Sequence, residues 1–110
     1  MKLNYIDQGR SLSPAVILIH GMFGSLSNLG MLGRTLLDQY RVISVDLRNH
    51  GDSPHEQVMD LPSMAADIVK LMDDLGIVKA TLVGHSLGGK IAMQIALNSP
   101  DRVKRLVVAD

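Results

Sequence analysis

Short segments typical of buried strands alternate along this chain with segments whose apolar residues recur at helical spacing. The strand candidates are residues 15–19, 41–46, 80–83 and 103–109. The run from Ala15 to Ile19 is apolar throughout and rich in β-branched residues, which indicates a strand covered on both faces of a parallel sheet. Helices between such strands predict βαβ units with right-handed crossovers. The expected fold class is therefore α/β, with a doubly wound, mostly parallel sheet.

Three helices are expected between these strands. Asn28 is the expected cap of the first, whose apolar stripe is Leu29, Leu32, Leu36 and Tyr40. Asp60 is the expected N-cap of the second, with Pro62 in its first turn and Gly76 at its end. Its apolar residues are Met64, Ile68, Leu71 and Leu75. The third carries the small residues Gly88, Ala92 and Ala96, which allow close packing on the sheet. Residues 2–6 are expected to add a short edge strand.

Composition narrows the class of protein. A chain of 110 residues is long enough for one small domain. Its eleven basic and eleven acidic residues balance, so nothing favours nucleic acid or an anionic membrane as a partner. There is no cysteine, which excludes disulfides and thiolate metal sites. No signal peptide or membrane span is evident, and a cytoplasmic location is the default expectation.

Ser86 stands between two glycines where a predicted strand turns directly into a predicted helix. The motif runs Gly84-His85-Ser86-Leu87-Gly88-Gly89. This G-x-S-x-G pattern has the form of a nucleophile elbow, in which a tight turn lifts a serine hydroxyl clear of the sheet. The first amides of the following helix favour a developing oxyanion beside it. The pattern predicts acyl transfer through Ser86.

Two further motifs, at residues 20–25 and 46–53, resemble those of the α/β-hydrolase superfamily. In that superfamily a His-Gly turn after the first buried strand supplies one oxyanion-hole amide. The resemblance implies that the backbone N–H of Met22, or of Phe23, and that of Leu87 would be the donors. His20 is interpreted as a structural histidine. The second motif, Asp46-Leu47-Arg48-Asn49-His50-Gly51-Asp52-Ser53, is interpreted as a structured loop, with Arg48 and His50 as hydrogen-bonding scaffold.

A narrower resemblance extends over the whole chain. Residues 20–30, 48–51 and 58–65 are similar to the YbfF-type bacterial esterases. The resemblance implies hydrolysis of short esters and acyl thioesters, including acyl-CoA, without a metal or organic cofactor. The implied partner is a small-molecule acyl ester or thioester.

The catalytic base is the missing element. In α/β-hydrolases the triad follows the order serine, acid, histidine, yet none of the four histidines follows Ser86. Asp110 is the candidate acid because it ends the last predicted strand, where some members of the superfamily carry their acid. Asp101 is interpreted as a turn residue. The chain is therefore expected to be the N-terminal portion of one α/β-hydrolase domain, inactive without its C-terminal half.

Other functions share this scaffold. Carbon–carbon bond hydrolases and the cofactor-free synthase of menaquinone biosynthesis use it, and these enzymes are expected to act poorly on simple esters. A non-catalytic, hydrolase-like receptor is the third possibility, for which a late histidine would be absent.

Overall fold

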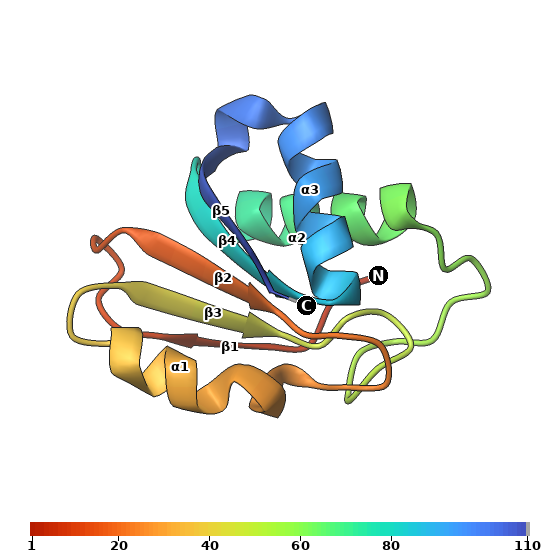
Figure 1. The fold of residues 1–110 in the computed structure, drawn as a ribbon, viewed down its shortest axis with the longest axis horizontal. Coiled ribbons are helices and arrows are strands. Elements are labelled where there is room, and N and C mark those ends of the chain that lie inside the picture. Colours follow the sequence, from red (N-terminus) through yellow and green to blue (C-terminus); the bar gives the residue numbers. More distant parts are fainter. Residues whose placement is uncertain (110) are drawn as a thin grey trace.

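The computed structural model describes residues 1–109, and the prediction for Asp110 lies outside the described residues. Five strands form one sheet in the order β1-β3-β2-β4-β5, with helices on both faces (Figure 1). The strands are β1 (Tyr5–Gln8), β2 (Ala15–Ile19), β3 (Arg41–Val45), β4 (Ala80–His85) and β5 (Val103–Ala109). The helices are α1 (Gly30–Leu36), α2 (Leu61–Asp74) and α3 (Leu87–Asn98), with short 3₁₀ turns η1 (Leu26–Leu29) and η2 (Pro100–Arg102). The predicted α/β class is confirmed.

The sheet is mixed because β1 is antiparallel to its neighbour. Strands β3, β2, β4 and β5 run parallel, and β2 is in register with both neighbours, so that Ile17 lies opposite Ile43 and Leu82. Strand β1 pairs with β3 in the opposite direction, with Tyr5 opposite Val45. The edge strand predicted at residues 2–6 is therefore real but displaced toward the C-terminus. Leu3 is buried in the core, outside the strand.

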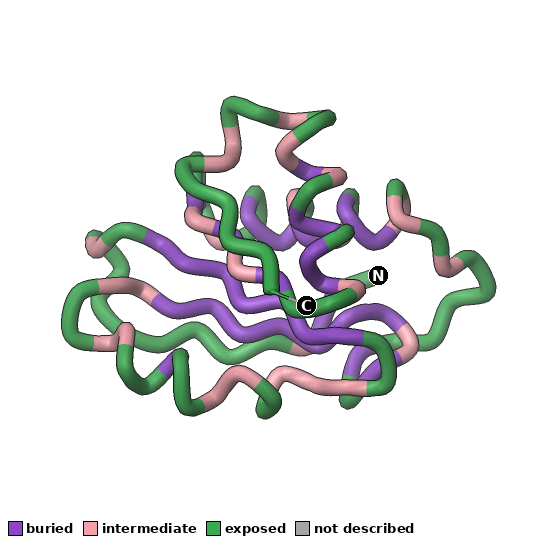
Figure 2. Tube along the Cα trace, viewed as in Figure 1, coloured by how far each residue is buried: buried purple, intermediate pink, exposed green. Residues whose placement is uncertain are grey.

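Alternate residues of β2 face two separate layers of core. Ile17 and Ile19 point into the larger cluster, which α2 and α3 cover with residues such as Ile68 and Ile91. Val16 and Leu18 point to the other face, where they pack against residues of η1, of α1 and of the segment that follows α1. Both faces of β2 are shielded from solvent, which explains its unbroken apolar sequence. Figure 2 shows the contrast along the sheet, since the central strands are buried whereas β5 is exposed along most of its length.

The first helix differs from its prediction. Asn28 does not cap α1; it lies inside η1, and its side chain accepts a 2.7 Å hydrogen bond from the Ser25 N–H. The α-helix begins only at Gly30, and Leu32 is 38% exposed instead of packed on the sheet. The 3₁₀ turn η1 uses the Asn28 side chain in its own capping box, so α1 begins one residue later than an N-cap at Asn28 would place it.

The second helix follows its prediction. The Asp60 carboxylate accepts the Ser63 N–H at 2.8 Å, and α2 ends before Gly76, whose φ is 69°. The predicted apolar stripe faces the larger core. Within residues 1–109 no helix is long and apolar enough to cross a membrane.

Candidate active site

Ser86 occupies a strained turn between β4 and α3. Its φ of 55° and ψ of −113° lie outside the regions that non-glycine residues favour. The turn closes only because its neighbours lack side chains. A Cβ on Gly84 would overlap the Gly88 carbonyl, and a Cβ on Gly88 would overlap the carbonyl of Ile19 on the adjacent strand. The sequence of glycines around Ser86 therefore has a steric reason at each position.

The backbone around Ser86 is held from both sides. Its N–H donates to the Ala109 carbonyl of β5 at 2.8 Å, and its carbonyl accepts the N–H groups of Gly89 and Lys90 at 2.9 and 3.2 Å. Leu87 is the first residue of α3, so its N–H has no acceptor within the helix. Ser86 is exposed and lines an open cleft of ≈ 560 Å³ with residues of the chain after β2.

The segment that follows β2 forms a tight turn over residues 21–24, which faces the elbow at Ser86 across the cleft. The Gly24 N–H donates to the Gly21 carbonyl at 3.0 Å, and Phe23 has a φ of 64°. A negative φ at Met22 followed by a positive φ at Phe23 makes this a type II turn. A Cβ on Gly21 would lie 3.3 Å from Ser86 Cβ, so the turn and the elbow are in close approach.

The two amides predicted as alternative oxyanion donors differ in their environment. The Phe23 N–H donates to His50 Nε2 at 3.0 Å. Among the described residues, the Met22 N–H makes no hydrogen bond. The Phe23 side chain is 94% exposed, so this residue is held by the hydrogen bond of its backbone N–H and not by packing of its ring.

A second turn, over residues 47–50, lies beside the first. Its His50 N–H donates to the Leu47 carbonyl at 3.0 Å, and Asn49 has a φ of 66°, so it has the same type II form. Two buried imidazoles connect the turns, with ring centres 5.1 Å apart. His20 Nδ1 donates to the Gly21 carbonyl at 2.7 Å, and its Nε2 accepts the Leu47 N–H at 3.1 Å.

His50, in the second turn, makes the second link, since it accepts a hydrogen bond from the first turn. Its Nδ1 donates to the Arg48 carbonyl at 2.9 Å, which leaves Nε2 as the acceptor for Phe23. Both imidazoles are thus neutral, with the proton on Nδ1. Burial of the His20 ring lowers its pKa below the ordinary value of 6.5. Neither ring has a free nitrogen to take a proton from Ser86.

The Asp46 carboxylate organises the loop that follows β3. It accepts hydrogen bonds from the Leu26 N–H, the Asn4 side chain and the Asp52 N–H, at 2.7, 2.9 and 3.0 Å. Burial by itself would raise the pKa of Asp46, but these three donors outweigh it and the pKa is lowered. A Cβ on Gly51 would overlap this carboxylate. Asp46 is therefore a structural centre that joins the segment before β1, η1 and the loop.

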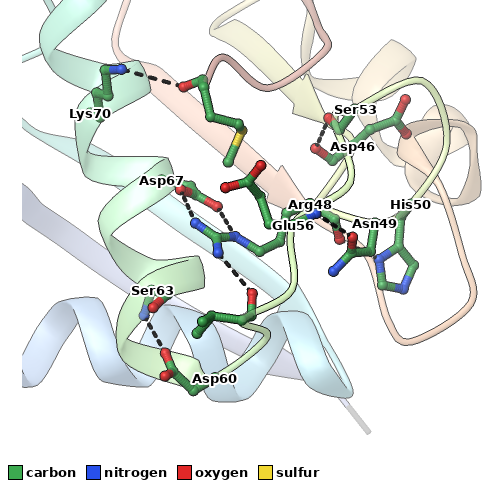
Figure 3. Close-up of polar contacts among 12 residues, drawn as sticks. Asp46, Arg48, Asn49, His50, Ser53, Glu56, Asp60, Ser63, Asp67 and Lys70 are labelled. Atoms are coloured by element: carbon green, nitrogen blue, oxygen red, sulfur yellow. Dashed lines mark hydrogen bonds and ion pairs between the residues drawn. The ribbon is translucent and has the colours of Figure 1, made fainter.

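Arg48 ties the same loop to α2 (Figure 3). Its guanidinium donates to both carboxylate oxygens of Asp67, at 2.7 and 2.8 Å, and to the Val58 carbonyl at 2.8 Å. These contacts agree with the scaffold role predicted for Arg48 and His50. Nothing in the sequence indicated that Asp67 would be the partner of Arg48, because it is one of several acidic residues on the same helix.

Of the remaining candidate site residues, some line the cleft and others lie on exposed segments outside it. Met22, Phe23 and His85 line the cleft with Ser86, and Leu87 follows directly at the start of α3. His55 is exposed on the loop before α2, and Asp101 is exposed in η2, before the first residue of β5. Within residues 1–109, no group of His, Asp and Glu side chains is arranged to hold a metal ion.

Comparison with known proteins agrees with this architecture. Residues 14–110 match the family model described as alpha/beta hydrolase fold. The chain is 45% identical along its whole length to esterase YbfF of Escherichia coli (strain K12), of which it spans 44%. It is also 45% identical to the sn-1-specific diacylglycerol lipase ABHD11 of Mus musculus, of which it spans 36%. A solved marine microorganism esterase matches with a TM-score of 0.95 at 37% identity, over 99% of this chain and 41% of its own. The chain spans less than half the length of these relatives, and it belongs to the α/β-hydrolase fold family.

Proposed function

We propose that the protein is a serine esterase that transfers the acyl group of a carboxylic ester or thioester to Ser86. The observation that carries the proposal is the backbone of Ser86, a φ of 55° at an exposed serine between two sterically required glycines. Strain of this kind costs about 1–3 kcal/mol and persists where the surrounding structure enforces it, most often at functional sites. Here it presents the hydroxyl to the cleft.

The reaction follows from the position of that hydroxyl. Ser86 Oγ forms a bond to the acyl carbon while its proton passes to a general base, and the alcohol or thiol takes up the proton as it leaves. Water then cleaves the acyl-enzyme, which releases the acid and restores the serine. His20 and His50 use both ring nitrogens elsewhere, so in this proposal the base is a histidine of the longer protein. Asp110 is the proposed acid that orients it.

The oxyanion would lie between two backbone amides. The Leu87 N–H stands at the start of α3, where the helix dipole favours negative charge, and the Met22 N–H has no other partner among the described residues. We favour Met22 over Phe23 because the Phe23 N–H is already bonded to His50. The loss of one such donor costs about 3–4 kcal/mol of transition-state stabilisation.

The names of the relatives support esters as the substrate class, since one is an esterase and another a diacylglycerol lipase. Acyl-CoA thioesters belong to the same proposal, because attack on a thioester places the same charge on the same oxygen. The test is a substrate panel of p-nitrophenyl esters, a diacylglycerol and acyl-CoA thioesters. Ser86→Ala in the complete protein is expected to lower kcat by roughly 10⁴-fold or more, whereas Ser11→Ala, an exposed serine outside the cleft, leaves it unchanged.

Equal rates for wild type and Ser86→Ala would contradict the proposal. A complete protein that fails on the whole panel but cleaves a carbon–carbon bond would instead belong to the alternative enzyme class. The 110-residue chain alone is expected to give no turnover on the panel.

A further inference from the structure

A second hollow, of ≈ 420 Å³, adjoins the cleft that contains Ser86. The two have Met22, Phe23 and Gly24 in common as lining residues, so the 21–24 turn forms part of the wall of both. The second hollow adds the lining residues Asn49, His50, Gly51 and Met59. A substituent of a substrate bound at Ser86 therefore reaches the second hollow by extending along the turn.

The side chains that line the second hollow offer no charge to a ligand. Among the described residues that line it, none is Asp, Glu, Lys or Arg. Both ring nitrogens of His50 are already hydrogen-bonded to backbone groups, and the Asn49 side-chain oxygen accepts the Glu56 N–H at 2.8 Å. Apolar surface comes from Met22, which is 47% exposed, and from Met59, which packs in part against the larger core. The hollow thus suits an uncharged, apolar group and not the phosphates of a coenzyme A thioester.

Phe23 is the residue of this wall whose type has no local explanation. Its φ of 64° is one that a non-glycine residue adopts at a cost, and glycine normally occupies this position of a type II turn. Its ring is 94% exposed, so burial within residues 1–109 does not offset that cost. A large apolar side chain kept exposed on the wall of a reaction cleft is typical of a surface that a ligand covers.

We propose that the second hollow binds an alkyl group of the ester substrate, and that Phe23 and Met59 set the preference for its length. The proposal rests on the proposed function, since it concerns the substrate that Ser86 attacks. An alkyl group can belong to the acyl side or to the alcohol side of an ester, and its contact with the hollow has the same chemistry in both cases. Contact with the Phe23 ring and the Met59 thioether removes apolar surface from water on both partners, so a longer alkyl group binds better.

Two series of esters test the hollow in the complete protein. p-Nitrophenyl acetate, butyrate and octanoate lengthen the acyl side, and ethyl, butyl and octyl acetate lengthen the alcohol side. In the series whose alkyl group enters the hollow, kcat/KM is expected to rise roughly 10-fold or more from the shortest to the longest ester, since each buried methylene contributes about 4-fold. The other series is expected to stay nearly flat, and the comparison identifies which side of the ester enters the hollow.

Two polar substitutions test the residues. Asparagine tolerates a positive φ, so Phe23→Asn keeps the turn but removes the ring, and Met59→Gln keeps the length of the side chain but makes its end polar. The ratio of kcat/KM for the longest ester to that for the shortest is expected to fall roughly 10-fold in Phe23→Asn and roughly 3-fold or more in Met59→Gln. The matched controls are Leu12→Asn and Met31→Gln, because both residues are exposed, at 98% and 75%, and line neither the cleft nor the hollow.

Thermal unfolding separates a binding role of Phe23 from a structural one. Phe23→Asn is expected to unfold at or above the wild-type midpoint, because an almost fully exposed ring contributes little packing and asparagine relieves the backbone strain. A clear fall in that midpoint would mean that the ring packs within the complete protein, and it would overturn the proposal.

The remaining outcomes are also distinguishable. Two flat series in wild type, or a length preference that both Phe23→Asn and Met59→Gln leave unchanged, would overturn the alkyl site while Ser86-dependent hydrolysis remained. Equal activity of wild type and Ser86→Ala would overturn the proposed function itself.

Discussion

The guanidinium of Arg48 and the carboxylate of Asp67 form a two-point ion pair, at 2.7 and 2.8 Å, which joins the loop after β3 to α2. Both side chains are almost buried, at 11% and 13% exposure. The pair closes a span of 19 residues that the backbone hydrogen bonds of the sheet do not reach. Through Arg48 and His50, hydrogen bonds thus connect α2 to the 21–24 turn that lines the cleft.

Asp67→Asn is expected to destabilise the fold by about 2–3 kcal/mol, because it leaves an almost buried guanidinium without a counter-charge. Asp73→Asn on the same helix is the matched control. Asp73 also pairs with an arginine, Arg102, but its carboxylate is 60% exposed, so the expected loss is below about 1 kcal/mol. Urea unfolding at neutral pH measures both, and equal losses would contradict the importance of the Arg48 pair.

Gly88→Ala is expected to destabilise the protein by about 3 kcal/mol or more, because the added methyl would overlap the carbonyls of Ile19 and His20. Gly76→Ala provides the comparison. Gly76 has a φ of 69° but nothing within 4 Å of an added Cβ, so only backbone strain of about 1 kcal/mol is expected. Thermal unfolding of both variants distinguishes crowding from strain, and a milder effect at Gly88 would contradict the close contact of α3 with β2.

The stability of the fold is expected to fall as the pH drops below 6.5. Burial lowers the pKa of His20 in the native state, so below the ordinary value of 6.5 the unfolded chain binds a proton that the native chain does not. This contribution is complete above pH 6.5 and is lost on acidification. His20→Gln is expected to flatten the pH dependence of the unfolding free energy between about pH 8 and pH 5, and the same substitution at His55, exposed on the loop before α2, is the control. An unaltered slope in His20→Gln would contradict this assignment.

The 110-residue chain by itself is expected to self-associate. Leu106, Val107 and Val108 of β5 are 41%, 48% and 43% exposed, and within the described residues no strand pairs with the outer edge of β5. An apolar edge of this kind favours pairing with another chain. Val107→Lys is expected to shift the distribution toward monomer in light scattering after size exclusion, whereas Val78→Lys, exposed before β4, is the control. A wild-type chain that stays monomeric at every concentration would contradict the prediction.

The strands could be predicted closely because their signals are local. The bounds predicted for 15–19 and 103–109 are those of the structure, and Asp60 and Gly76 mark the ends of α2 as expected. The helix after Asn28 is present, and its start was predicted wrongly because an asparagine satisfies either an N-cap or the third position of a capping box. Only the placement of Ser25 against η1 decides between these two roles.

The sequence by itself determined the alternation of strands and helices and the glycines that allow the turn at Ser86, since periodicity and steric size act between near neighbours. The tertiary structure alone decided which amide of the 21–24 turn is occupied. The Phe23 N–H meets His50 and the Leu47 N–H meets His20 across 27 residues in each case. Backbone amides look alike in a sequence, and their partners are chosen only when β2 and β3 align side by side and bring the two turns together.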